Sequence, residues 1–69
     1  MDEQELLHKI SVDTNVNIEL LKDLYKNNKL WTLIKTEKTI DSVRLVRSIA
    51  PRVGLREAKM IVEEFAATN

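Results

Sequence analysis

Five basic side chains lie within residues 44–59 of this 69-residue chain, and no other group of residues in the sequence is as well suited to binding an anion. Only Glu57 opposes them there, although the whole chain balances eleven basic against eleven acidic residues. Guanidinium and ammonium groups bind carboxylates and phosphates, and a local positive field steers an acidic partner even when the net charge is zero. We therefore expect a binding surface that includes Arg44, Arg47, Arg52, Arg56 and Lys59.

Residues suited to catalysis are sparse in the sequence. There is no cysteine, and no serine has an evident base partner. His8 is the single histidine, so a two-histidine metal site cannot form, and we expect its side chain to be exposed to solvent. Glu63 and Glu64 are adjacent on an expected helix and point about 100° apart, so they cannot act as a carboxylate pair. No glycine-rich phosphate loop is present. We predict no enzymatic activity and no metal or other cofactor.

The elements that position these residues are predicted to be helices. One glycine, one proline and many helix-forming residues favour an all-α fold. We predict four helices, over residues 2–10, 15–26, 39–50 and 55–67, with a polar break at 11–17. Thr39 is the expected N-cap of the third helix, Pro51 ends it, and Gly54 is expected to allow a turn closed to other residues. Residues 30–34 are too short to separate helix from strand by periodicity, and a helix is favoured because no partner strand is evident.

The last two predicted helices are amphipathic. On a helical wheel the buried side of 39–50 carries Val43, Val46, Ile49 and Ala50. The buried side of 55–67 carries Ala58, Ile61, Val62, Phe65 and Ala66. If these apolar faces pack together, one rim holds Ile40, Arg44, Arg47, Arg56 and Lys59. The alternative interpretation is an ordinary solvated face with intrahelical pairs such as Lys59–Glu63.

The same segments carry a family resemblance. Ile-Asp-Ser-Val-Arg-Leu-Val-Arg at 40–47, followed by Gly-Leu-Arg-Glu-Ala-Lys-Met-Ile-Val-Glu at 54–63, resembles the C-terminal domain of the bacterial ribosomal stalk protein, the seven/twelve stalk family. The resemblance covers about residues 39–65, and its second half is the more specific. It implies a helix-turn-helix hairpin whose rim docks translation factors. The positions that it implies for contact are Ile40, Val43, Arg44, Arg47 and Lys59.

The sequence also departs from the stalk pattern. The connection at 50–54 is one residue longer than in the family, and the three-stranded sheet that supports the hairpin there has no counterpart here. We therefore expect a single small helical domain, in which residues 1–38 supply supporting helices, or a second copy of the chain supplies the support. A small chain with this hairpin is also consistent with a phage or accessory protein that imitates a host surface.

Three functional hypotheses follow. The first is a non-catalytic protein-interaction module that docks an acidic or mixed surface through Ile40, Val43, Arg44, Arg47, Arg56 and Lys59. The second is a nucleic-acid-binding helix-turn-helix that presents Arg52 and Arg56, although a net charge of zero counts against it. The third is a purely structural helical oligomer.

Size and composition bear on assembly and location. Because a core of this size is marginal, we consider a homodimer in which Met60 or Trp31 contributes to self-association. For Trp31, packing inside the core is the favoured interpretation, because the core contains few aromatic residues. The acidic start of the chain is unlike a signal peptide, and no stretch approaches the about 20 apolar residues of a membrane span. The expected location is the cytoplasm, with no membrane partner.

Overall fold

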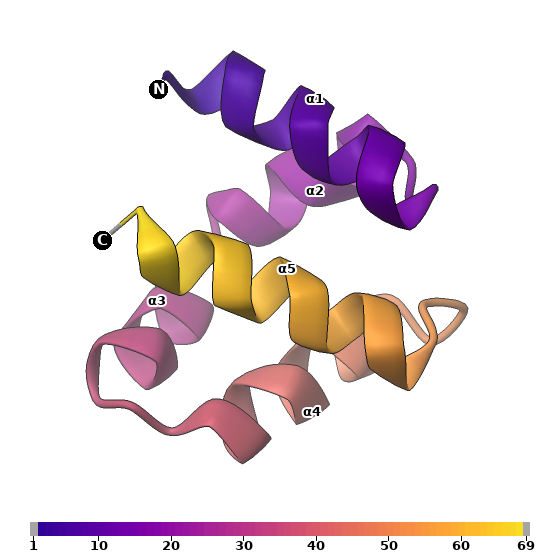
Figure 1. Ribbon diagram of the computed structural model, residues 1–69. Helices are drawn as coiled ribbons and strands as arrows, with labels where there is room; N and C mark the ends of the chain where they lie inside the picture. The colour runs from indigo at the N-terminus through magenta and orange to yellow at the C-terminus, as the bar shows by residue number, and fades with distance from the viewer. Residues whose placement is uncertain (1, 69) are drawn as a thin grey trace.

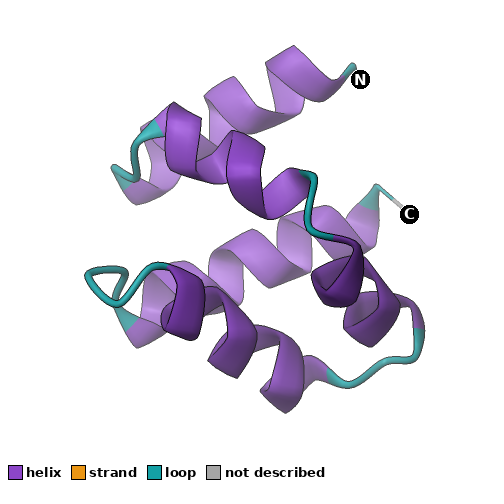
Figure 2. Ribbon diagram, turned by 180° about the vertical axis from the view of Figure 1, so that it is seen from behind, coloured by secondary structure: helices purple, strands orange, loops and turns teal. Residues whose placement is uncertain are grey.

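The computed structural model describes residues 2–68, which form five α-helices and no strand. The helices are α1 (Glu3–Thr14), α2 (Ile18–Tyr25), α3 (Asn28–Lys35), α4 (Thr39–Ile49) and α5 (Leu55–Ala67). Short loops join them (Figure 2). The all-α prediction is confirmed. The helix count differs from the predicted four because residues 30–34, which the sequence left between helix and strand, lie inside α3.

Side-chain caps explain where the first three helices begin. Asp2, Asn17 and Asn27 precede α1, α2 and α3, and each side-chain oxygen accepts a backbone N–H bond, at 2.8, 2.8 and 3.0 Å. Such caps satisfy donors that have no partner within the helix. The expected cap at Thr39 is wrong. Thr39 is the first residue of α4, and Lys38 occupies the cap position without a side-chain hydrogen bond.

The predicted polar break at 11–17 is too long. Helix α1 continues to Thr14, and two polar side chains in this segment donate to backbone carbonyls without interrupting the helix. The Thr14 hydroxyl donates to the Ile10 carbonyl at 2.7 Å, and the Ser11 hydroxyl donates to the Val16 carbonyl at 2.7 Å. Asn15 then adopts a left-handed conformation with φ of 57°, which ends the helix.

The core is one hydrophobic cluster to which all five helices contribute. Helix α5 lies between α1 and α4 (Figure 1), and it packs against α1, α3 and α4. The predicted buried faces of α4 and α5 are right at most positions. Ile49 and Ala66 are the exceptions, because they lie near the C-terminal ends of their helices and remain exposed. Ser42, which was not predicted to be buried, is fully buried, and its hydroxyl donates to the Lys38 carbonyl at 2.8 Å.

Three aromatic rings link α2, α3 and α5. Trp31 stacks on Phe65 with ring centroids 5.3 Å apart and planes 11° apart, and Tyr25 meets both rings edge-on. The Trp31 indole N–H donates to the Tyr25 carbonyl. Phe65 is fully buried, whereas Trp31 and Tyr25 are partly buried against the core. Trp31 is therefore a packing residue that joins α3 to α5.

The connection between α4 and α5 is a tight turn that is anchored in the core. The Val53 N–H donates to the Ala50 carbonyl at 3.0 Å, and both of these side chains are buried. Pro51 stands after Ala50, where its fixed φ suits a turn. Gly54 has φ of −69° and ψ of 162°, an extended conformation open to any residue. The expectation that Gly54 supplies a conformation closed to other residues is therefore wrong.

Candidate functional site

A groove with a volume of about 470 Å³ lies between α4 and the start of α5. Helix α4 lines most of its length, because Thr39, Ile40, Val43, Arg44, Arg47 and Ser48 recur on one side of that helix at helical spacing. The first two turns of α5 complete the groove with Leu55 and Lys59. Both helices also bury their opposite sides in the core, so the packing of the core holds α4 and α5 in place on either side of the groove.

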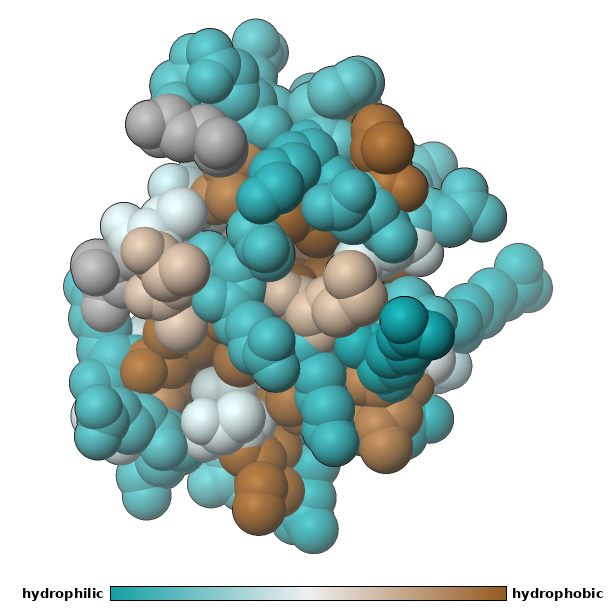
Figure 3. All heavy atoms as spheres, viewed as in Figure 1, coloured by the Kyte–Doolittle hydropathy of each residue, from teal (hydrophilic) through white to brown (hydrophobic). Residues whose placement is uncertain are grey.

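Aliphatic side chains form the floor and two edges of this groove. Val43 is only 6% exposed and contributes the floor, whereas Ile40 is 71% exposed and Leu55 is 50% exposed. Figure 3 shows hydrophobic surface between hydrophilic groups at the lower edge of the molecule, where α4 and the start of α5 lie. Exposed aliphatic residues that share one groove are typical of a contact surface. Ile40 and Leu55 are thus the two available apolar anchors.

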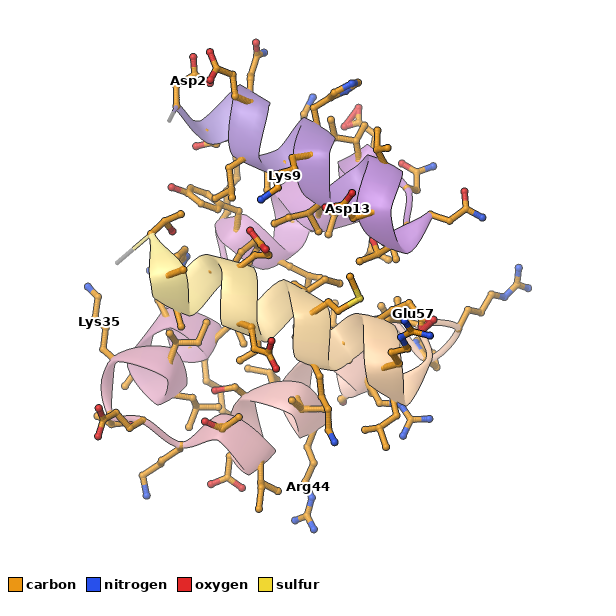
Figure 4. The ribbon with its side chains drawn as sticks, in the orientation of Figure 1. Asp2, Lys9, Asp13, Lys35, Arg44 and Glu57 are labelled. Carbon is orange, nitrogen blue, oxygen red and sulfur yellow. The ribbon has the colours of Figure 1, made fainter. Side chains whose placement is uncertain are left out.

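Three cationic side chains lie beside these anchors. Arg44, Arg47 and Lys59 line the groove and are exposed. In Figure 4 Arg44 points away from the body of the molecule at its lower edge. Among residues 2–68 the ion pairs join Lys9 to Glu64 and Lys22 to Glu19, each at 3.5 Å, so no groove cation is paired with an acid. The alternative interpretation, a solvated face with intrahelical ion pairs, named a Lys59–Glu63 pair, and this pair does not form among residues 2–68.

The structure places five of the six partner-binding residues expected from the sequence at the groove. These are Ile40, Val43, Arg44, Arg47 and Lys59. Val43 is buried, as the helical wheel predicts, and it still lines the groove. Arg56 is exposed but does not line the groove, because it projects about 60° further around α5 than Lys59 does. Arg52 is the middle residue of the turn at 50–54 and lines a different depression, together with residues of the α1–α2 connection.

Three groove residues escaped the sequence reasoning. Thr39 and Ser48 are small polar residues of α4 with no distinguishing pattern. Leu55 shares the buried arc of α5 on a helical wheel, which assigns it to the core. Its exposure comes from its position as the first residue of α5, where the neighbouring helices no longer cover that arc. Its place at the start of the predicted helix 55–67 was the one available signal.

The two residues considered for self-association lie away from the groove. Trp31 packs on Phe65, as described above, and its exposed part lines a shallow depression with Tyr25, Asn28, Lys35 and Thr68. Met60 is half-buried. Neither residue lines the groove, whereas the exposed aliphatic residues Ile40 and Leu55 both do. A homodimer through Trp31 or Met60 stays a prediction.

Within residues 2–68, no three histidine, cysteine, aspartate or glutamate side chains come together in a way that could hold a metal ion. In the same part of the chain, every helix is too short or too polar to cross a bilayer. Comparisons with family models, with curated proteins and with solved structures give no match. The resemblance of residues 39–65 to the stalk hairpin therefore stays a prediction from the sequence.

Proposed function

We propose that this protein is a non-catalytic interaction module that docks an acidic surface of another protein in the groove between α4 and α5. The observation that supports the proposal is the combination of two exposed aliphatic anchors with three unpaired cations in one groove. The anchors supply affinity, because burying an aliphatic side chain contributes about 1.5–3 kcal/mol. The cations supply orientation and selectivity, because each needs a carboxylate once water is excluded.

The groove residues divide this work between them. Ile40 and Leu55 insert between side chains of the partner, and Val43 closes the floor beneath them. Arg44 and Arg47 can each bind a carboxylate through two parallel N–H bonds, which a lysine cannot do. Lys59 adds a point charge from α5. If the stalk resemblance holds, a translation factor is the first partner to test.

A protein partner fits this groove better than nucleic acid does. A phosphate backbone is bound by cations and polar groups, and it makes no use of exposed isoleucine and leucine side chains. The zero net charge of the chain also provides no general attraction for nucleic acid.

Affinity capture with matched charge variants tests the proposal. The groove variant is Arg44→Glu with Lys59→Glu, and the control is Lys26→Glu with Lys29→Glu, which makes the same charge change at exposed positions outside the groove. We expect the wild type and the control to retain a common set of proteins that the groove variant loses. Circular dichroism must show equal helicity in all three. Retention of that set by the groove variant refutes the proposal.

Titration with duplex DNA and with RNA at low and high salt distinguishes protein docking from the alternative function, nucleic-acid binding. We expect little binding at either salt concentration. Tight binding that falls steeply as salt rises favours the nucleic-acid hypothesis instead.

A further inference from the structure

We infer that the segment docked in the α4–α5 groove is an amphipathic α-helix of two to three turns, with acidic residues beside its apolar stripe, contributed by a different protein. This inference rests on the proposed function. It adds the conformation of the bound segment, its residue pattern and the exclusion of a second copy as the occupant.

The lining of the groove argues for a helical ligand. All eight lining residues belong to α4 or α5, and residues 2–68 contain no strand, so the groove has no sheet edge. An extended peptide gains affinity from main-chain bonds to such an edge, and here its backbone groups would find no main-chain partner in the groove. A polyproline segment needs aromatic side chains in its groove, and none of the eight is aromatic. A helix satisfies its own backbone and packs between two helices through side chains alone.

The dimensions of the groove set the length of that helix. From Thr39 to Ser48 the lining runs along nine residue steps of α4, which correspond to about 14 Å at 1.5 Å a residue. A partner helix lying along the groove covers this distance with about ten residues. Ile40 stands near the start of α4, and Leu55 follows the turn after its end. Apolar residues at positions i, i+3 or i+4, and i+7 of the partner can therefore reach both anchors.

The charges of the groove select an acidic partner and disfavour a second copy. Two copies docked groove to groove about a two-fold axis would oppose six cations from Arg44, Arg47 and Lys59, and no acidic residue lines the groove to offset them. Like charges facing one another across an interface oppose association. A foreign helix with glutamate or aspartate beside its apolar stripe matches the same cations.

Synthetic peptides test the conformation and the charge pattern directly. The probe is a 14-residue capped peptide of alanine, leucine and glutamate, with leucines spaced three and four apart and glutamates beside them. One control peptide has a proline at its centre, which breaks the helix. A second control replaces every glutamate with lysine. Binding is measured by titration into the isotope-labelled protein with NMR.

We expect the acidic helical peptide to shift amide signals of residues 39–48 and 55–59 and to leave those of α1 unchanged. Both control peptides should bind at least about tenfold more weakly. Ile40→Gln and Arg44→Glu should each lower the affinity for the acidic peptide by about tenfold. Arg56→Gln should change that affinity by less than about twofold. Equal binding of the proline peptide, or signal changes centred outside the groove, overturns the inference.

Two further outcomes keep this inference separate from the proposed function. If affinity capture depends on the groove but the helical peptide shows no advantage, the inference fails and the proposed function stands. Sedimentation at several protein concentrations tests the exclusion of a second copy. A dimer that is lost in the Arg44→Glu, Lys59→Glu variant, or that is strengthened by it, would place a second copy in the groove and overturn the inference.

Discussion

Glu37 adopts a backbone conformation that a glycine would hold at lower cost. It lies between α3 and α4 with φ of 61°. Its N–H donates to the Ile34 carbonyl at 3.0 Å, and the next N–H, of Lys38, donates to the Leu33 carbonyl at 2.9 Å. These two bonds close the C-terminus of α3 in a Schellman motif, whose left-handed position is usually glycine. For a residue with a Cβ atom, the left-handed conformation costs about 1–2 kcal/mol.

We predict that Glu37→Gly stabilises the protein by about 0.5–1 kcal/mol. The substitution removes the left-handed penalty, but glycine gives the unfolded chain extra freedom worth about 0.4–1 kcal/mol. Among residues 2–68 no ion pair includes Glu37, so none is lost. For a domain of this size each kcal/mol moves the melting temperature by about 4–8 °C. The expected rise is therefore about 2–8 °C.

Thermal and urea unfolding followed by circular dichroism measure this effect. Glu37→Gln is the matched control, because it removes the same charge and keeps the Cβ atom, and we expect it to leave the stability close to that of the wild type. A glycine variant no more stable than the glutamine variant refutes the left-handed assignment. An equal rise in both variants assigns the effect to charge instead of backbone conformation.

Two further substitutions probe the core and the start of α5. Phe65→Ala should destabilise the protein by about 3–5 kcal/mol, a third or more of the about 3–10 kcal/mol expected for a chain of this length, while Phe65→Leu should still fold. Urea unfolding monitored by Trp31 fluorescence checks this, and near-wild-type stability of Phe65→Ala contradicts the central place of the ring. Gly54→Ser should stabilise by about 0.5–1 kcal/mol, because serine adopts the same extended backbone and forms an N-cap with Glu57 three residues later. The added Cβ meets only the flexible Glu57 carboxylate, at 2.7 Å, and loss of stability in a thermal melt contradicts this reasoning.

Helix positions were predictable where local chemistry decides them. The residue before Pro51 had to leave the helical region, and α4 does end at Ile49. The polar segment at 11–17 shows the limit of this reasoning. Ser11 and Thr14 are typical of caps and turns, yet here their hydroxyls bond to backbone carbonyls and the helix continues. Only the packing of α1 against α2 and α5 decides between these two uses of the same side chains.

The candidate site was predictable only in part, for a similar reason. Helical spacing places Ile40, Arg44 and Arg47 together on α4, because residues three and four apart share one face of a helix. Whether Arg56 or Leu55 joins them depends on how α5 crosses α4, and spacing within one helix contains no information on that crossing. The turn at 50–54, held by two buried side chains, settles it in favour of Leu55.

The sequence by itself determined the helical class, the amphipathic faces of α4 and α5 and the concentration of cations between residues 44 and 59. These properties follow from propensity, periodicity and charge, all of which act over a few neighbouring residues. The tertiary structure alone decided that Trp31 stacks on Phe65 and that Leu55 is exposed and lines the same groove as Ile40. Each of these depends on which helices cover one another, and that is fixed by how all five pack into a single core.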